Sequence, residues 1–432
     1  MSETQSSTNM STSLLRLAAL GQAHPRRCFT NLNGYLNREL LETAYDNTRK
    51  DGAVGVDGRT AQDYERDLKG NLDSLLRRAK AGSYRAPPVK RAYIPKGQGQ
   101  RPIGVPTFED KVLQRAVTMI LEPLYEPLFH KHSYGYRRGR SAHQALASVR
   151  HRLGKQGGGY VIELDIQAFF DNLDKHHLRT FLKQRIGDGV ILRLIDKWLK
   201  AGVMEAGSVH YPEKGSPQGG VISPMLANIY LHHVLDRWLE GVAKPRLLND
   251  VTLIRFADDA VIILRNEQDA RKLLDVLSKR FNRYGLQLHP EKTHLTVFKP
   301  GIRSSIDFLG LTHFWKCGRK GWGISRKTMK SRFARAIKAI KEWCKYNRFR
   351  SIKEQYADLS RKVQGHYAYY GISGNIAALK RYRYAVEKVW IKWLRRRSQR
   401  HRLRRKSVQP FLDRYCLPMP SIITNKPAKV MN

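Results

Sequence analysis

Two adjacent carboxylates, Asp258 and Asp259, interrupt an otherwise apolar stretch at residues 251–264. The β-branched and apolar residues on either side predict two buried strands joined by a hairpin. An isolated Asp pair is most simply a solvated turn, because Asp favours turns. In a buried hairpin, however, two neighbouring carboxylates repel one another unless a cation is present. The pair therefore indicates a site for divalent metal.

A third carboxylate, Asp165, ends the apolar segment 160–164, which predicts another strand. If this strand neighbours the hairpin in one sheet, Asp165 and Asp258 can share metal. Two-metal phosphoryl transfer needs such a cluster, with ions roughly 3.5–4 Å apart. Mg²⁺ suits carboxylate and phosphate oxygens. The alternative is that Asp165 caps the N-terminus of the following helix.

A glycine-rich segment at residues 215–220 is the third element with chemical potential. Glycine allows a backbone to approach a ligand closely. Gln218 within it can both donate and accept hydrogen bonds. An ordinary β-turn is the alternative interpretation of this segment.

The charge of the chain indicates the partner of these residues. The 432 residues contain 79 Lys and Arg against 37 Asp and Glu, a formal net charge of +42. Such an excess favours a polyanionic partner, and nucleic acid is the obvious one. An anionic membrane is the rival, but no apolar run is long enough to span a bilayer. The four cysteines lack metal-ligand spacing, so we expect no zinc finger, reduced thiols and a cytoplasmic location.

The hydrophobic pattern predicts an α+β fold with a largely antiparallel sheet. Residues 13–80 are expected to be mainly helical. Further strands are expected at 87–95, 286–298 and 306–314, with a Gly-rich turn at 96–101 and a helix near 270–284.

From about residue 327 the pattern changes to three basic amphipathic helices, which predict a small helical bundle. A run with eight Lys and Arg in twelve residues follows at 395–406. A solvated basic helix end is the simple interpretation, and nucleic-acid binding the functional one. The basic residues are Arg395, Arg396, Arg397, Arg400, Arg402, Arg404, Arg405 and Lys406.

Taken in order along the chain, these segments resemble the reverse transcriptase family. The strand ending at Asp165 resembles the first metal motif of the family. Ser216-Pro-Gln-Gly219 resembles its nucleotide-and-template loop, and Phe256-Ala-Asp-Asp259 its catalytic hairpin. Residues 285–293 and 308–311 resemble the two blocks that follow. Each motif alone is weak, but the ordered set is specific.

The closer resemblance is to the reverse transcriptase/maturases of bacterial group II introns, and it covers nearly the whole chain. The N-terminal motifs that carry it are Gly55-Val-Asp-Gly58, Tyr84-Arg-Ala-Pro-Pro88, Ile94-Pro-Lys96, 101–107 and 133–141. The resemblance implies a right-hand polymerase fold, with fingers and an antiparallel palm sheet, followed by an α-helical thumb. The implied divisions are an N-terminal extension (1–80), fingers and palm (81–315), the thumb or maturase domain (316–395) and a basic nucleic-acid-binding tail (396–432).

The resemblance also implies roles for the residues near the carboxylates. Asp165 and Asp258 would bind two Mg²⁺ ions, with Asp259 assisting. Lys96 and Arg101 would hold the incoming deoxynucleoside triphosphate, since a point charge and a guanidinium fork both suit phosphate. A solvated basic turn is the alternative for the last two.

Three further residues gain roles from the resemblance. Phe170 would be an aromatic gate against a ribose 2′-hydroxyl, and core packing is compatible with that role. Gln218 would lie near the nucleotide sugar. Lys292 would neutralise or protonate the leaving pyrophosphate, with a plain surface lysine as the alternative.

The chain departs from the family pattern at Phe256, where the family usually has Tyr. The missing hydroxyl binds no metal, so we expect catalysis to survive, with primer contact or fidelity open to change. After residue 406 there are no paired cysteines and no histidine cluster. We therefore expect no nuclease domain and no cleavage of the second DNA strand.

The resemblance implies an RNA-directed DNA polymerase that also binds its intron RNA and promotes splicing. Its partners would be intron RNA, a DNA primer or target and deoxynucleotides; nothing in the sequence sets an oligomeric state. Two alternatives stay open. One is a splicing cofactor without polymerase activity, and the other a free-standing reverse transcriptase in defence or repair.

Overall fold

The computed structural model describes residues 3–96, 99–205, 208–211, 219–397 and 407–422. The chain is an α+β protein, as the sequence predicts, and it divides into two compact units. The first unit comprises Met1–Ser141, Leu164–Ala260 and Arg271–Thr293. The second comprises Ala142–Glu163, Val261–Ala270 and His294–Asn432.

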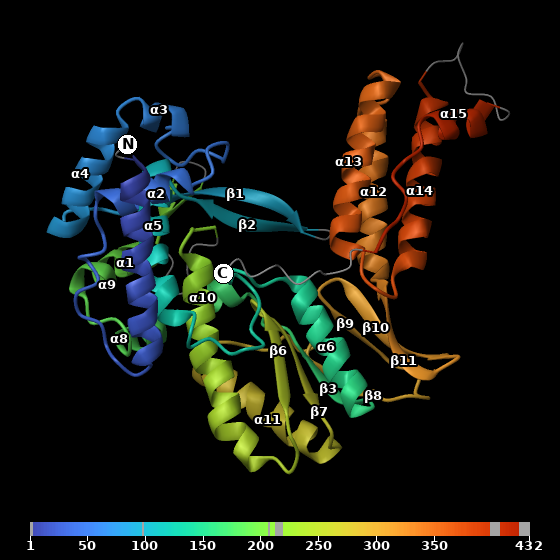
Figure 1. Cartoon of the computed structure of the whole chain (residues 1–432), viewed down its shortest axis with the longest axis horizontal. Helices are drawn as coiled ribbons and strands as arrows, with labels where there is room; N and C mark the ends of the chain where they lie inside the picture. The colour runs from blue at the N-terminus through green and yellow to red at the C-terminus, as the bar shows by residue number, and fades with distance from the viewer. Residues whose placement is uncertain (1–2, 97–98, 206–207, 212–218, 398–406, 423–432) are drawn as a thin grey trace. The chain divides into compact units, whose positions relative to one another are not determined.

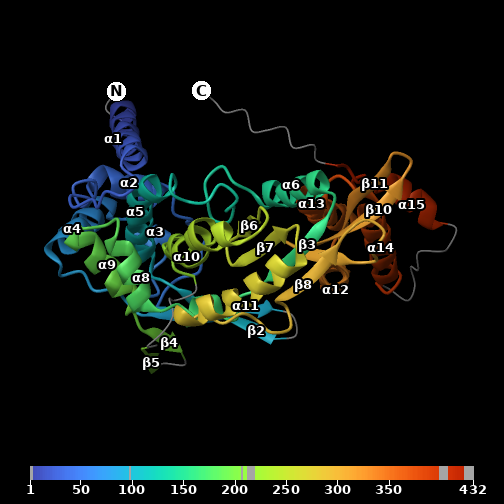
Figure 2. The ribbon, with the colours of Figure 1, turned by 90° about the horizontal axis from the view of Figure 1, so that it is seen from below.

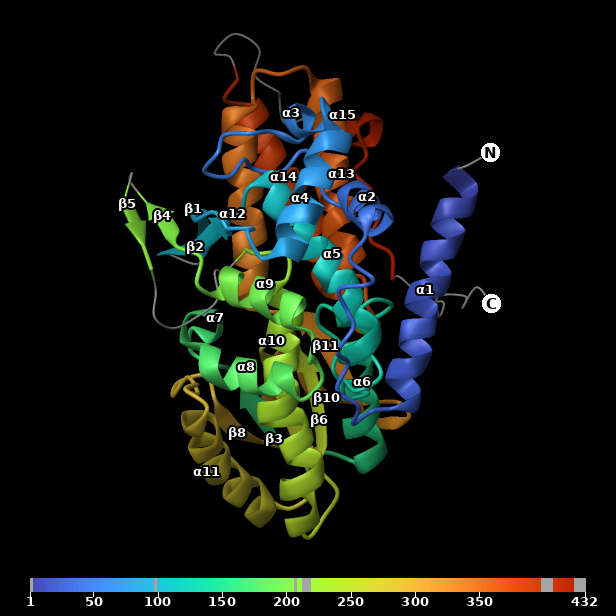
Figure 3. The same ribbon diagram turned by 90° about the vertical axis from the view of Figure 1, so that its left-hand side faces the viewer.

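The first unit begins with helices, as the sequence predicts for residues 13–80, and a further helix follows the first two strands. They are α1 (Glu3–Ala23), α2 (Arg38–Asp46), α3 (Ala61–Glu65), α4 (Leu68–Ala81) and, after the first two strands, α5 (Phe108–Tyr125). Apolar residues at helical spacing explain their packing, since Leu40, Leu72 and Leu113 are all fully buried. Helix α2 packs against α4 and α5 (Figure 3).

A four-stranded sheet of order β2-β1-β4-β5 also belongs to the first unit. Its strands are β1 (Val89–Lys96), β2 (Gly99–Val105), β4 (Val203–Glu205) and β5 (Ser208–His210). The predicted turn at 96–101 is too long. Lys96 pairs with Gly99 and Ile94 with Arg101, so the two strands extend into the predicted turn.

The rest of the first unit is mainly helical. Its helices are α7 (Phe169–Asn172), α8 (Lys175–Lys183), α9 (Gly189–Leu199), α10 (Ser223–Leu231) and most of α11 (Glu267–Arg283). Helix α10 continues into two π-helical turns, His232–Asp236 and Leu239–Ala243, and a 3₁₀ turn, Lys244–Arg246. π-Helical turns are wider than α-helical ones, change the direction of side chains and often occur at functional sites.

A second four-stranded sheet has the order β6-β7-β3-β8. Its strands are β6 (Thr252–Phe256), β7 (Asp259–Leu264), β3 (Gly159–Leu164) and β8 (His294–Phe298). β3 and β8 are antiparallel. The predicted strand 286–298 is wrong in its first half, where Leu288 makes only an isolated bridge with Ile166. Pro290 lacks a backbone donor and begins a turn there, which prevents a continuous strand.

In the second unit, helix α6 (Ala142–Gln156) precedes β3, and a three-stranded antiparallel sheet of order β11-β10-β9 follows β8. Its strands are β9 (Ser305–Phe308), β10 (Leu311–Gly318) and β11 (Gly321–Thr328), and Figure 2 shows β10 and β11 side by side. The single strand predicted at 306–314 is instead a hairpin. Leu309 and Gly310 have φ of 49° and 79°, the geometry of a two-residue turn.

The predicted helical bundle is present as α12 (Lys330–Tyr346), α13 (Ile352–Tyr370) and α14 (Ile376–Leu394), which lie side by side in Figure 1. Leu359, Val386 and Trp390 are fully buried in its core. The short helix α15 (Val408–Arg414) and Leu417 also pack there, so part of the predicted tail is folded against the bundle. No helix in the described ranges is both long and apolar enough to cross a membrane.

Candidate active site at the β6–β7 turn

The β6–β7 hairpin confirms the predicted strands and turns at the paired aspartates. Strand β6 ends at Phe256 and β7 begins at Asp259, so Ala257 and Asp258 form the turn. Asp258 is half-buried and Asp259 is exposed. Ala257 has a φ of 56°, in the left-handed region that residues other than glycine rarely adopt. A strained backbone residue therefore stands directly before Asp258.

A loop at residues 132–136 lies against this turn. The Arg255 backbone exchanges two hydrogen bonds with the loop, at 2.9 and 2.8 Å. Gly135 approaches so closely that an added Cβ would lie 2.2 Å from the backbone nitrogen of Ala257. Only a glycine fits without displacing the turn.

Asp165 directly follows β3, and its backbone is fixed by residues 288–293. The Asp165 N–H donates to Thr293 Oγ1 at 3.2 Å, and the His289 N–H donates to the Asp165 carbonyl at 2.9 Å. The N-cap of α7 is Ala168, which makes no side-chain cap. The alternative that Asp165 caps this helix is therefore wrong, because the helix begins too far along the chain.

Asp165 and Asp258 lie at the same end of two neighbouring strands. β3 and β7 are adjacent in the sheet. At their other end, a Cβ added to Gly159 would lie 2.3 Å from the carbonyl oxygen of Leu264. The start of β3 thus meets the end of β7, so the strands run in opposite directions. Equal chain lengths separate Gly159 from Asp165 and Leu264 from Asp258.

The three carboxylates fit a hard divalent cation by their chemistry. Mg²⁺ is commonly held by one or two carboxylates together with waters and substrate phosphates. Within the described ranges, however, no three His, Cys, Asp or Glu side chains gather closely enough to hold a metal ion by themselves. The Lys292 Nζ lies 3.6 Å from Asp165 Oδ1, so this carboxylate already attracts a cation. Substrate oxygens would have to complete the metal coordination.

Tyr136 connects the carboxylates with Arg101 electrostatically. Burial, followed by the negative charge of Asp258, raises the pKa of the Tyr136 phenol. Asp259 adds to this shift and Arg101 opposes it. The phenol is therefore protonated at neutral pH and able to donate a hydrogen bond. Arg101 belongs to β2 and is half-buried, so the structure brings this predicted phosphate ligand into the neighbourhood of the turn.

The other predicted nucleotide ligands from these loops are partly described. The backbone of Lys96 ends β1, where it forms the last residue pair with β2, opposite Gly99. Gln218 lies outside the described residues. Gly219, directly after it, has a φ of 113°, and an added Cβ would lie 2.3 Å from the Gly104 carbonyl oxygen. The glycine-rich segment therefore ends against β2, the strand that carries Arg101.

Phe170 lies on α7, five residues after Asp165. The side chain is buried, with 8% exposed, and its ring meets Phe169 edge to face at 5.2 Å. These contacts agree with core packing, which is compatible with a gate at the inner wall of a nucleotide site.

The basic end of α14 belongs to the second unit and is described only as far as Arg397. Arg396 lies 5.5 Å above the ring of Trp393, and Arg397 Nη2 donates to the Phe349 carbonyl at 3.1 Å. Arg348 lies 4.3 Å above the Phe349 ring, which is 61% exposed. Arginines thus lie against one exposed and one buried aromatic ring at this end of the bundle. The predicted Arg400, Arg402, Arg404, Arg405 and Lys406 lie outside the described residues.

The sequence analysis assigned no role to the individual residues that support the β6–β7 turn. Arg255, Asp236 and Asn228 form a buried polar cluster, and Gly135 and Tyr136 form its neighbour loop. A signal for Arg255 was present, because a charged residue inside an apolar strand requires a partner. The identity of the partner was not readable, since Asp236 lies 19 residues earlier on a helical segment.

Comparisons with known proteins identify the family to which the chain belongs. The family model described as "Reverse transcriptase (RNA-dependent DNA polymerase)" matches residues 94–313. The chain is 37% identical over 229 residues to the group II intron-encoded protein LtrA of Lactococcus lactis subsp. cremoris, covering 52% of this chain and 38% of LtrA. It is 32% identical over 304 residues to protein YkfC of Escherichia coli strain K12, covering 62% of this chain and 77% of YkfC. The chain thus spans well under half of LtrA but most of YkfC.

The close approach of Gly135 to the turn can be tested by adding one methyl group. Gly135→Ala should lower the free energy of unfolding by about 1–3 kcal/mol, because overpacking displaces the Ala257 backbone. Denaturant unfolding followed by circular dichroism measures the change.

Gly154→Ala on α6 is the matched control, because nothing lies within 4 Å of its added Cβ. This variant should gain roughly 0.5–1 kcal/mol from the better helix former. A Gly135→Ala protein as stable as the wild type would contradict the described contact.

Proposed function

Because the chain belongs to the reverse transcriptase family, within the reverse transcriptase/maturases of group II introns, we propose that it copies RNA into DNA. The observation that supports this most strongly is the position of Asp165 and Asp258 at one end of antiparallel neighbouring strands. Two Mg²⁺ ions, when bound, would activate the primer 3′-hydroxyl and stabilise the charge that develops on the transferred phosphate. Asp165 and Asp258 would hold these ions, and Asp259 would assist.

The cationic residues around the carboxylates fit an incoming deoxynucleoside triphosphate. Lys96 and Arg101 come from the β1–β2 hairpin, and Arg101 acts electrostatically on the same tyrosine as Asp258. Lys292, 3.6 Å from Asp165, is suited to neutralise the departing pyrophosphate. Gln218 is proposed to contact the sugar. Phe170, buried directly after the Asp165 strand, is proposed to exclude the ribose 2′-hydroxyl.

The intron-encoded relatives support a wider role for the chain in the mobility and splicing of an intron. The chain would use intron RNA as template, prime on DNA and promote splicing, in association with nucleic acid in a bacterial cytoplasm. Residues 81–315 would act as fingers and palm, with the α12–α14 bundle as the thumb or maturase domain. The net charge of +42 supports a nucleic-acid partner.

The basic end of the bundle is proposed as part of the RNA surface. Arg395, Arg396 and Arg397, together with the basic residues up to Lys406, would contact phosphates. The exposed rings of Tyr346 and Phe349 would stack on unpaired bases, because every base offers an aromatic face.

Primer extension tests the polymerase assignment. With an RNA template, a DNA primer, deoxynucleotides and Mg²⁺, the wild type should extend the primer. Asp258→Ala should reduce the rate by about 10³-fold or more, because several kcal/mol of metal-mediated stabilisation is lost. RNA binding should be unchanged.

Asp250→Ala removes an exposed carboxylate from the segment before β6 and serves as the control, since Asp250 lies at the surface, where it pairs with Lys244. An Asp258→Ala protein that still extends primers would contradict the site. A wild type that binds RNA and promotes splicing but extends no primer would favour the splicing-cofactor alternative. Polymerisation without any effect on splicing of the neighbouring intron would favour the free-standing enzyme.

The proposed gate makes a separate prediction. Phe170→Ala should raise the use of ribonucleotides relative to deoxynucleotides by about 10-fold or more, because the space for a 2′-hydroxyl opens. Competitive incorporation of the two sugars measures the ratio. Unchanged sugar discrimination in a folded variant would leave Phe170 with a packing role only.

The RNA surface is tested through salt dependence. In a plot of log affinity against log salt, replacing Arg395, Arg396 and Arg397 with Gln should make the negative slope shallower by about 2. Each phosphate contact on single strands contributes about 0.7 to the steepness of this slope. Replacing Lys316, Arg319 and Lys320, exposed near the β10–β11 turn, changes net charge equally. If both triple variants change the slope alike, net charge rather than local contact explains the binding.

A further inference from the structure

A fully buried arginine lies beneath the β6–β7 turn. Arg255 has no exposed surface, although the residues beside it in β6 are apolar. Its Nε and Nη2 donate to the two carboxylate oxygens of Asp236 at 2.9 and 2.7 Å. Its Nη1 donates to the Ala257 carbonyl at 2.9 Å. One guanidinium group therefore joins a carboxylate on the π-helical turn to the strained residue that precedes Asp258.

The same guanidinium is connected to the loop that covers the turn. Arg255 Nη1 also donates to Asn228 Oδ1 at 3.0 Å. The Asn228 Nδ2 in turn donates to the Gly135 carbonyl at 2.8 Å. Both sides of the close contact between Gly135 and Ala257 are thus held from one buried cluster.

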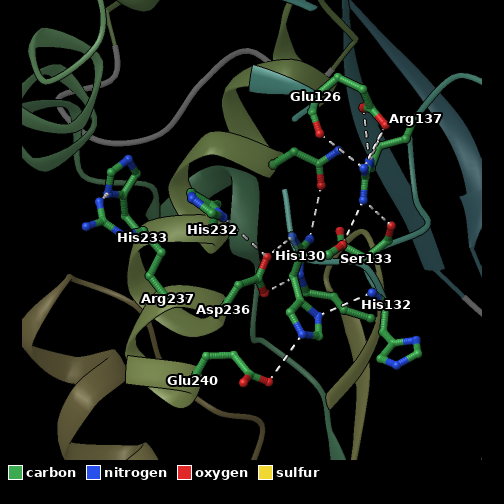
Figure 4. A network of polar contacts seen from close by, with 12 residues as sticks. Glu126, His130, His132, Ser133, Arg137, His232, His233, Asp236, Arg237 and Glu240 are labelled. Carbon is green, nitrogen blue, oxygen red and sulfur yellow. Dashed lines mark hydrogen bonds and ion pairs between the residues drawn. The ribbon is translucent and has the colours of Figure 1, made fainter. Parts of the chain in front are cut away.

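The surroundings of Asp236 leave Arg255 as its charged partner. His232 Nδ1 lies 3.9 Å from Asp236 Oδ2, and burial lowers the pKa of His232 to about 4, so this ring is neutral at pH 7. Burial also lowers the pKa of His130. Figure 4 shows Asp236 and His232 on the helical segment, facing Ser133 of the loop and His130, which precedes the loop.

We propose that Arg255 and Asp236 are positioning residues for the metal-binding carboxylates. The guanidinium holds Ala257 in its left-handed conformation, and this conformation sets the direction in which Asp258 presents its oxygens. Asp236 fixes the guanidinium in turn. The proposal rests on the proposed polymerase function, because it concerns the same carboxylates.

A role in stability alone does not explain this choice of residues. Replacing a buried ion pair with apolar residues of similar volume is often neutral or stabilising. What an apolar pair cannot do is donate a hydrogen bond to the Ala257 carbonyl. Lysine also falls short, because its single ammonium group lacks the planar fork that reaches several acceptors at once.

Two variants separate positioning from stability. Arg255→Lys keeps a positive charge opposite Asp236 but loses the fork. Arg255→Met combined with Asp236→Leu removes both charges together, so no uncompensated charge is left buried. For each full-length variant, Mn²⁺ affinity is measured by electron paramagnetic resonance, alongside the Mg²⁺ dependence and kcat of primer extension and the thermal midpoint.

Arg185→Lys is the matched control. Arg185 is also buried and donates to backbone carbonyls, at 2.6 Å to Gly21 and 3.3 Å to Leu124. Neither of these acceptors belongs to the β6–β7 turn. This variant should lose stability without a change in Mn²⁺ affinity.

Both Arg255 variants should lose about 10–100-fold in Mn²⁺ affinity or kcat, the usual effect of removing a residue that orients a metal ligand. The KM for deoxynucleotides should change less. Wild-type Mn²⁺ affinity and kcat in a folded Arg255 variant would overturn the proposal while leaving the polymerase intact. A wild type without any Mn²⁺ binding that depends on Asp258 would overturn this proposal together with the proposed function.

Discussion

The left-handed turn at Ala257 is the constraint on which the candidate site depends. It lets β6 pass directly into β7 while Asp258 stays at the end of the strand pair, beside the strand that carries Asp165. Such a conformation costs free energy for alanine, roughly 1–2 kcal/mol, and persists only where the surrounding structure enforces it. Here the Gly135 loop presses on one side, and the Arg255 guanidinium binds the Ala257 carbonyl from the other.

The buried cluster around Arg255 and the more exposed cations Arg101 and Lys292 have different proposed roles. Arg255, Asp236 and Asn228 are buried, and they bind one another through hydrogen bonds. Such a network of buried hydrogen bonds favours a single geometry of the turn. Arg101 and Lys292 lie nearer the surface, and we propose that they bind a triphosphate there. We propose that this rigid support and these more accessible cations together select a substrate by phosphate charge and metal coordination.

Local patterns in the sequence were sufficient for the elements that carry the carboxylates. Alternating and continuous apolar runs predicted the β6–β7 hairpin and the strand before Asp165, and helical spacing predicted α12, α13 and α14. Strand limits failed where a backbone detail decided them. Pro290 ended a predicted strand, and the Leu309–Gly310 turn divided another.

The support of the site could not be read from local patterns, because it depends on contacts between distant segments. Gly135 lies within the motif at 133–141, but only the structure shows that this glycine is the one that approaches Ala257. Arg255 was recognisable as a charge in an apolar strand, but the choice of Asp236 over other acids follows from the π-helical turn that carries it. Tertiary packing of this kind is invisible to periodicity.

We propose that Asp165 and Asp258 bind the same metal centre. The most direct measurement replaces Mg²⁺ with Fe²⁺ in the complex with RNA template, DNA primer and a non-incorporable nucleotide. Hydroxyl radicals generated at the bound iron then cut the nearby polypeptide. Cuts are expected close to both residues 165 and 258, suppressed by excess Mg²⁺ and absent in Asp258→Ala. Cuts at only one of these segments, or cuts that Mg²⁺ does not suppress, would contradict it.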